Sequence, residues 1–370
     1  SLNGLVTTQH VAGPVLWAHT DGQTRYHACR CVRGELNVTR TITTLVLVLA
    51  WGSVPASTLF DSDEVLEIRI TGPLGQFIDE RYDREELPFE LRAGDEVHTI
   101  EIRSRGKSRM RACTFPPIRL DFASDEVAGT QFEGQDKLKL VTHCIPGKSG
   151  QANVIEEFAA YRIFNLLSDV SYRVRPLRVT YTDTDGEHDE LVSNAFIIES
   201  DENLAARIGG RIVEMPGIRK SMLNREQAAL VYIFQYLVAN TDWSLVASEG
   251  EEFCCHNGDL FEMNGQIYYV PFDFDLSGLV NARYAKPDPS LRIKKVTSRY
   301  YQGYCIEPDA LAAALAKINA AEADILAVFD AVPGLTDKEI ATARRCLLYT
   351  SPSPRDLNPN LGFRLLLAHG

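Results

Sequence analysis

Short runs of alternating apolar and polar residues fill the chain between residues 65 and 122. The runs lie at residues 66–70, 89–91, 99–103 and 118–122, with Gly or Pro between them. Alternation with a period of two is typical of strands that bury one face. We therefore predict an antiparallel sheet in this part of the chain.

The pattern after residue 125 mixes strands with helices. Alternating runs predict strands at residues 137–141, 175–181, 195–199 and 266–270. Apolar residues at helical spacing predict helices at residues 153–167, 225–238, 309–329 and 337–345. The order predicts an α+β protein with a small strand-rich part followed by a mostly helical part.

Both ends of the chain read as segments outside the fold. The apolar run 41–51 follows Arg40 and ends at Val54-Pro55-Ala56, which is typical of a secretory signal peptide at residues 35–56. A buried strand or helix is the alternative. Residues 1–34 then come from translation upstream of the natural start. Residues 346–370 begin with eleven residues that resemble a translated sequencing adapter, so we exclude them from the fold.

Composition narrows the function classes. The 370 residues are 45% hydrophobic and 24% charged, with a formal net charge of -12. A nucleic-acid partner is disfavoured because phosphate binding by counterion release requires a basic face. No zinc-ligand spacing occurs among the cysteines. In an exported protein Cys113 and Cys144 are the first candidates for a disulfide, with buried free thiols as the alternative.

Two aspartates, Asp273 and Asp275, directly follow an apolar strand and flank one aromatic residue. A carboxylate at the end of a buried strand is costly unless something neutralises it, and a divalent cation is a natural partner. A turn in which both aspartates cap backbone amides explains the pair alone equally well. Asp242 and Asn257 favour the metal site, because phosphoryl transfer needs a carboxylate for the attacking hydroxyl and an amide near the metal. We interpret His256 as a hydrogen-bonded loop residue.

Several cations are candidates for holding phosphates. Lys139 precedes Glu157 by 18 residues, which leaves room for a loop and one helical turn. A strand lysine held by a helix glutamate can reach nucleotide phosphates. A basic turn between two predicted strands is a second candidate and contains Arg105, Lys107 and Arg109. Solvated surface is the alternative for both.

Three segments share a pattern with a known family. They are the basic turn 102–109 with the strand 115–120, the helix end 236–243, and Val270-Pro271-Phe272-Asp273-Phe274-Asp275. Together they resemble the CotH-type spore-coat protein kinase family and, more distantly, HipA-type and secretory-pathway atypical kinases. The resemblance spans about residues 97–305. It implies a two-lobed protein-kinase-like fold, with an antiparallel sheet in the N-lobe and a mostly helical C-lobe. The implied regions are an N-terminal β-rich region at 57–125, an N-lobe at 126–200 and a C-lobe at 201–345.

The resemblance also implies roles for individual residues. Asp242 would be the catalytic-loop aspartate and Asp273 the principal metal ligand, with Asn257 and Asp275 as further ligands. Lys139 with Glu157 would form the nucleotide-phosphate pair, and Arg105 would contact phosphate. The family usually has lysine after the proline of the basic strand, where this chain has Pro117-Ile118-Arg119. The phosphate-binding cation is therefore Arg119 or Lys139.

The implied function is a metal-dependent phosphotransferase with ATP and Mg or Mn as cofactors. It would be bacterial, exported to the periplasm or beyond, monomeric, free of the membrane after signal cleavage, and active on a protein or small hydroxyl acceptor. Residues 281–301 are basic and aromatic, which fits either an acceptor-docking surface or an irregular packed segment. The alternatives are a catalytically inactive binding or scaffold protein of the cell envelope and a metal-dependent phosphoesterase.

Overall fold

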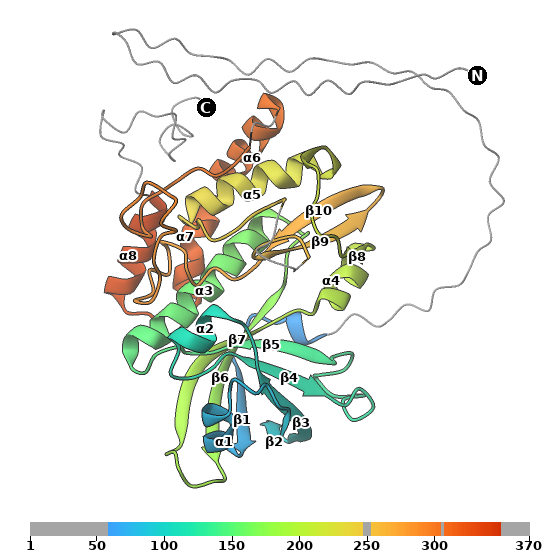
Figure 1. Cartoon of the computed structure of the whole chain (residues 1–370), viewed down its shortest axis with the longest axis vertical. Coiled ribbons are helices and arrows are strands. Elements are labelled where there is room, and N and C mark those ends of the chain that lie inside the picture. The colour runs from blue at the N-terminus through green and yellow to red at the C-terminus, as the bar shows by residue number, and fades with distance from the viewer. Residues whose placement is uncertain (1–57, 247–252, 305–306, 349–370) are drawn as a thin grey trace, which may run out of the picture. The chain divides into compact units, whose positions relative to one another are not determined.

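Seven strands in the part of the chain before residue 200 close into one barrel (Figure 1). The computed structural model describes residues 58–246, 253–304 and 307–348, which all belong to one unit. Around the barrel the order is β1-β2-β3-β4-β5-β7-β6. The strands are β1 Leu66–Gly72, β2 Leu87–Ala93, β3 Glu96–Ser104, β4 Ile118–Phe122, β5 Lys137–Val141, β6 Val174–Asp183 and β7 Leu191–Ile198.

A parallel pair closes the barrel. Strand β1 is antiparallel to β2 on one side and parallel to β6 on the other, in a register that runs from Leu66 opposite Leu177 to Gly72 opposite Asp183. The predicted two-lobed kinase-like fold, with an antiparallel sheet in its N-lobe, is therefore wrong, because the strands form a closed barrel with one parallel pair. Alternation in the sequence shows which face of a strand is buried, but it does not show which distant strand pairs with it. A closed barrel also has no free sheet edge. The implied boundary at residue 125 falls between two barrel strands, β4 and β5.

The barrel interior is apolar, as the alternation predicts. In β5, Leu138 and Leu140 are fully buried inside the barrel, while Lys139 between them lies on the outer face. The same alternation buries Ile68 and Ile70 of β1. The outward-facing side chains of these strands can therefore contact the rest of the molecule.

Helices make up most of the regular secondary structure outside the barrel in the described part of the chain. The helical elements are η1 Thr58–Phe60, α1 Leu74–Asp79, α2 Ser108–Ala112, α3 Lys148–Leu167, α4 Asp201–Ile208, η2 Lys220–Met222, α5 Arg225–Leu237, α6 Pro308–Ala320, α7 Glu322–Ala331 and α8 Asp337–Leu348. The predicted helix at 153–167 begins earlier, at Lys148, and the predicted helix at 309–329 is divided at Ala321. None of the described helices is long and apolar enough to cross a bilayer.

Helix α3 lies between the barrel and the helices α5 and α7 (Figure 1). It is buried on nearly all sides, which is typical of a central helix. The Phe158 ring lies 5.8 Å from that of Phe196 in β7, and the Phe164 ring lies 4.8 Å from that of Phe234 in α5. Aromatic packing therefore holds α3 against the barrel on one side and against α5 on the other.

A small second sheet has the order β10-β9-β8, with β8 before α5 in the chain and β9 and β10 after it. Its strands are β8 Arg211–Val213, β9 Gly258–Met263 and β10 Gln266–Pro271. Asn264 and Gly265, both with positive φ, form the two-residue turn between β9 and β10. Such an Asn-Gly pair is a strong hairpin signal, and it accounts for β9, which the apolar pattern does not predict.

Most of the residues in the predicted end segments lie outside the described part of the chain. The predicted signal peptide at 35–56 and the segment before it lie outside the described part of the chain. Of the predicted adapter segment, only residues 346–348 are described, as the last turn of α8.

Candidate functional site

The open end of the β9–β10 hairpin brings Asn257 and Asp273 together. Asn257 immediately precedes β9, and Phe272 and Asp273 immediately follow β10. The backbone N–H of Phe272 donates to the carbonyl of Asn257 at 3.1 Å, which extends the ladder by one step. The two predicted site residues Asn257 and Asp273 therefore lie at the same end of the hairpin.

Asp242 joins them from the end of α5. Its backbone N–H donates to Oδ1 of Asn240 at 3.0 Å, which sets the turn after the helix. One carboxylate oxygen of Asp242 lies 2.8 Å from Nε2 of His256, and the other accepts from Nδ2 of Asn257 at 2.8 Å. The structure therefore brings the predicted residues Asp242, Asn257 and Asp273 to one hairpin end, with His256 as a direct partner of Asp242.

The loop that carries His256 and Asn257 is fixed from several sides. The Tyr269 hydroxyl donates to the carbonyls of these two residues at 3.1 and 2.9 Å. A side chain at Gly258 would collide with the Tyr269 ring, so only glycine permits this approach. Just before His256, Cys254 and Cys255 form a disulfide with each other that the sequence reasoning did not predict.

Two of the site residues have left-handed backbone conformations. Asn257 has a φ of 52° and Asp273 a φ of 60°. Asn and Asp tolerate this region better than most residues. Such conformations persist only where the surroundings enforce them, and they cluster at functional sites. Here the Phe272 hydrogen bond to Asn257, and the bond from the Asp273 N–H to the Tyr161 hydroxyl at 2.9 Å, provide that support.

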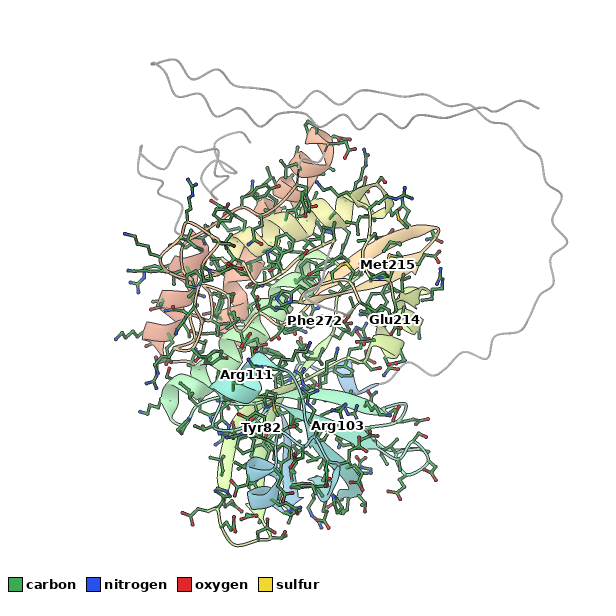
Figure 2. All side chains as sticks on the ribbon, viewed as in Figure 1. Tyr82, Arg103, Arg111, Glu214, Met215 and Phe272 are labelled. Atoms are coloured by element: carbon green, nitrogen blue, oxygen red, sulfur yellow. A yellow bond between two sulfur atoms is a disulfide. The ribbon has the colours of Figure 1, made fainter. Side chains whose placement is uncertain are left out.

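A buried arginine binds three carboxylates next to this hairpin end. Nη2 of Arg109 lies 2.7 Å from Glu157 and 3.0 Å from Asp273, and Nε lies 2.7 Å from Asp275. Arg109 comes from the short helix α2, on which Arg111 is exposed (Figure 2). Sequence reasoning placed Arg109 in a basic turn without assigning it this role. The signal available was the group of buried carboxylates, which requires a cation.

The cluster carries more negative than positive charge. Burial lowers the pKa of Arg109, but the Asp275, Glu157 and Asp273 carboxylates together hold it well above its ordinary value. Burial raises the pKa of Glu157 to about 8 although Arg109 opposes the rise, and burial likewise raises the pKa of Asp275. One guanidinium cannot neutralise three carboxylates, so the cluster favours an additional cation or a proton.

A disulfide holds α2 in place. Cys113, which follows α2, is bonded to Cys144, which precedes α3, with their Cα atoms 4.5 Å apart. This confirms the predicted pair. The backbone N–H of Thr114 also donates to the carbonyl of Cys144 at 2.9 Å. The position of Arg109 therefore depends on a covalent bond between two segments that flank the barrel strands β4 and β5.

Arg105 is a second cation beside Asp273. Burial lowers its pKa, and the strongest opposing influence is the Asp273 carboxylate. The side chain is half-buried, and within the described residues its buried Nε has no hydrogen-bond partner. Arg105 is therefore a guanidinium near Asp273 with donor capacity left for a ligand.

Lys139 forms an ion pair in a neighbouring cluster, whereas Glu157 pairs with Arg109. Its Nζ lies 3.2 Å from Asp201 and 5.0 Å from the centre of the Phe272 ring. Figure 2 places Phe272 between the hairpin and the barrel strands, in agreement with that contact. The pairing of Lys139 with Glu157 implied by the resemblance is wrong, because Glu157 faces Arg109. Lys139 nevertheless lies beside the residue that precedes Asp273.

Two further residues surround Lys139. The Tyr172 hydroxyl donates to Asp201 at 2.8 Å and also hydrogen-bonds to Asp259 of β9. Burial raises the pKa of Asp259, with Lys139 opposing the rise. None of Asp201, Asp259 and Tyr172 was predicted, since each comes from an element whose position depends on tertiary packing.

Arg119 lies apart from the Arg109 cluster. It is on the outer face of β4, opposite Arg103 of β3 and Lys139 of β5. Its guanidinium binds Asp121 at 3.2 Å and Glu86. Among the described residues no hydrogen bond or ion pair joins Arg119 to Asp273, so of the two cations left open by the resemblance Lys139 is nearer the site.

The oxygen donors at the hairpin end suit a metal that is shared with phosphate. Asp273 uses one oxygen for Arg109, and its side chain is 36% exposed. Asn257 uses its Nδ2 for Asp242, which leaves Oδ1. Within the described ranges no group of three His, Cys, Asp or Glu side chains is arranged to hold a metal by itself. Mg²⁺ commonly takes one or two protein carboxylates and completes its shell with phosphates and water, so these residues fit such an ion.

Comparison with family profiles and with curated protein sequences finds no match. The likeness to CotH-type kinases therefore rests on the motifs, and function must be inferred from the residues themselves.

Proposed function

We propose that this chain is a metal-dependent phosphotransferase that uses ATP and acts on a hydroxyl group of a protein or small molecule. The observation that carries the proposal is the joining of Asp242, Asn257 and Asp273 through the Asp242–Asn257 hydrogen bond of 2.8 Å and the Asn257–Phe272 backbone bond of 3.1 Å. Phosphoryl transfer uses this set: a carboxylate for the hydroxyl, and an amide and a carboxylate for the metal.

Asp242 takes the role of positioning the attacking hydroxyl and accepting its proton. Its contacts with His256 and Asn257 hold the carboxylate in one orientation. About a third of the side chain of Asp242 is exposed, so an acceptor can approach it. A positioned general base contributes about 10² to 10⁴ in rate.

Asp273 and Asn257 would hold Mg or Mn, which when bound neutralises charge on the β- and γ-phosphates. Asp275 takes a supporting role, because its carboxylate is buried and bound to Arg109 and to the Tyr284 hydroxyl at 2.9 Å. Arg105 supplies a guanidinium for the phosphates. Lys139 contacts the ring of Phe272, the residue before Asp273.

We also propose that the protein acts outside the cytoplasm. The disulfide between Cys113 and Cys144 supports this, because such bonds form and persist in oxidising compartments. The predicted signal peptide points the same way.

The proposal is tested with γ-labelled ATP, Mg or Mn, and acceptors that include the protein itself and small hydroxyl compounds. We expect metal-dependent transfer that Asp242→Asn lowers by about 10² or more, whereas Asp95→Asn, on an exposed turn, leaves it unchanged. Equal transfer by the wild type and Asp242→Asn would overturn the assignment. Release of phosphate without transfer to any acceptor would indicate a phosphoesterase.

A second candidate is a non-catalytic binding protein that retains the nucleotide site. The 3.0 Å contact between Arg109 and Asp273 favours it, because this guanidinium already partly neutralises the metal-binding carboxylate. That reading predicts binding of ATP with metal but no labelled product under any condition of the same assay.

A further inference from the structure

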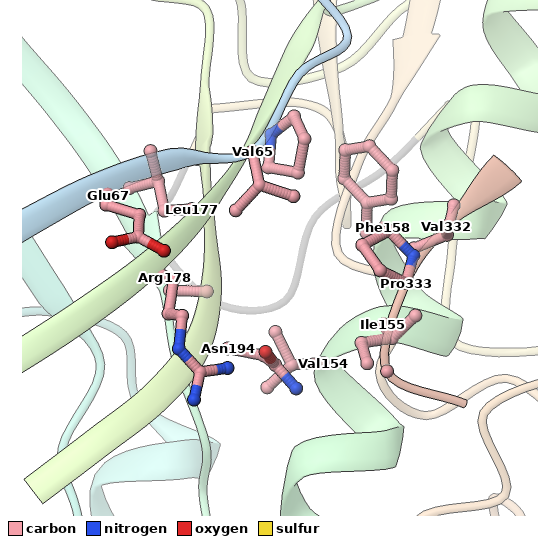
Figure 3. Close-up of a pocket in the computed structure, with 13 residues that line it drawn as sticks. Val65, Glu67, Val154, Ile155, Phe158, Leu177, Arg178, Asn194, Val332 and Pro333 are labelled. Atoms are coloured by element: carbon pink, nitrogen blue, oxygen red, sulfur yellow. The ribbon is translucent and has the colours of Figure 1, made fainter. Parts of the chain in front are cut away.

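A cavity of about 270 Å³ lies on the outer face of the barrel, away from the hairpin end (Figure 3). Strands β1, β6 and β7 form one wall, and α3 with the turn after α7 forms the other. The α3 side is apolar, with Ile155 and Phe158, and Val332 and Pro333 close it at the turn. The cavity therefore has room and apolar surface for a small side group.

The barrel side of the cavity is charged. Glu67 of β1 lies directly opposite Arg178 in the parallel pair with β6, and Arg178 lies opposite Asn194 in the antiparallel pair with β7. Neighbouring strands are about 4.8 Å apart, so the three side chains stand in one row. Figure 3 shows all three at the rim of the same cavity.

Both charged groups in the row are exposed, and within the described part of the chain neither forms a hydrogen bond or an ion pair. Elsewhere on the outside of the barrel, Arg69 is paired with Glu190 and Arg92 with Glu90. A row that holds one free anion and one free cation over an apolar cavity is complementary to a ligand with both charges and an apolar body.

We propose that this cavity binds a small zwitterion with an apolar side group, of the class of an apolar α-amino acid. Arg178 takes the carboxylate, for which a guanidinium offers two parallel donors. Glu67 takes the ammonium, and Asn194 donates to the carboxylate or accepts from the ammonium. The side group lies against Phe158, Ile155 and the turn after α7.

Size and charge separate this class from related ligands. At about 270 Å³ the cavity lies just below the range of about 300–1,000 Å³ that is typical of ligand pockets, which suits a small molecule of the size of leucine. A fatty acid would leave Glu67 beside a second carboxylate, and like charges at this spacing repel. One end of a long peptide carries only one of the two charges.

The test is calorimetric titration of L-leucine into the full chain, with N-acetyl-leucine and leucinamide as analogues that lack the ammonium and the carboxylate. We expect L-leucine to bind, and each analogue to bind about tenfold or more weakly, since each loses a charged hydrogen bond. Arg178→Gln and Glu67→Gln should each weaken L-leucine by a similar factor, while Arg92→Gln, a matched change elsewhere on the barrel surface, should not.

Circular dichroism of each variant checks that the fold is retained. Absence of L-leucine binding to the wild type overturns the proposal. So does binding of L-leucine by both cavity variants as tight as by the wild type. Binding of N-acetyl-leucine as tight as that of L-leucine also overturns it and would indicate a site for a simple anionic amphiphile.

Discussion

Replacing Arg109 by methionine removes the guanidinium but keeps most of the unbranched stem. In the wild type this side chain is 8% exposed and contacts Glu157, Asp273 and Asp275 at 2.7 to 3.0 Å. After the change the three carboxylates remain close together with no cation between them. The mutual repulsion of the three carboxylates and their burial then both destabilise the folded state.

The expected loss in the free energy of unfolding is about 3–5 kcal/mol at pH 8, which is typical when one partner of a buried ion pair is removed. The loss should depend on pH. Burial already raises the pKa of Glu157 to about 8 from its ordinary value of 4.5, although Arg109 opposes the rise. A raised acid pKa means that the folded state holds a proton that the unfolded state gives up, so stability falls as pH rises through this window. The difference from wild type should therefore shrink toward pH 4.5.

Urea denaturation followed by tryptophan fluorescence measures the effect. Arg92→Met is the matched control, because its ion pair with Glu90 is about half exposed and such pairs contribute about 0–1 kcal/mol. In a double-mutant cycle, Asp275→Asn should recover about 1–3 kcal/mol of the loss in Arg109→Met. A loss no larger than that of the control, or a coupling near zero, refutes the central role of Arg109.

Three further predictions concern the surroundings of the site. Burial raises the pKa of Glu156 to about 8, so wild-type stability should fall between pH 4.5 and 8, and Glu156→Gln should reduce that fall in pH-dependent thermal unfolding by up to a few kcal/mol. Replacing Cys113 and Cys144 with serine should cost about 3–4 kcal/mol in urea unfolding, from the 31-residue separation of the pair; a cost below 1 kcal/mol would contradict the bond. Phe274 is fully buried with its ring 4.7 Å from that of Tyr161, so Phe274→Ala should cost about 3–5 kcal/mol and Phe274→Leu clearly less by the same measurement.

Local patterns in the sequence identified most strands and the long helices. Strands β4 and β5 have the predicted bounds, and α5 differs from its prediction by one residue. These elements were predictable because each buries one face or is apolar throughout, which leaves a period in the sequence. The barrel was not predictable in this way, since its closure depends on the pairing of β1 with β6, and pairing between distant strands leaves no local signal.

The candidate site was predictable where chain neighbours carry it. Asn257 and Asp273 flank one hairpin, and Asp242 lies in the turn after the preceding helix α5, so three successive segments of the chain bring them together. The partners of Glu157 and Lys139 come from α2 and α4, whose placement depends on packing and on the Cys113–Cys144 bond. Their identification required the three-dimensional arrangement.

The most direct test of the central claim is calorimetric titration of ATP, with Mn²⁺ present and with the metal chelated, into the wild type and Asp273→Asn. Asp95→Asn serves as the acid-to-amide control. We expect metal-dependent binding to the wild type and the control, and binding at least about tenfold weaker to Asp273→Asn, because that variant loses the carboxylate at the hairpin end. Binding of equal strength by Asp273→Asn and the wild type, or binding indifferent to the metal, would contradict a metal and nucleotide site at this place.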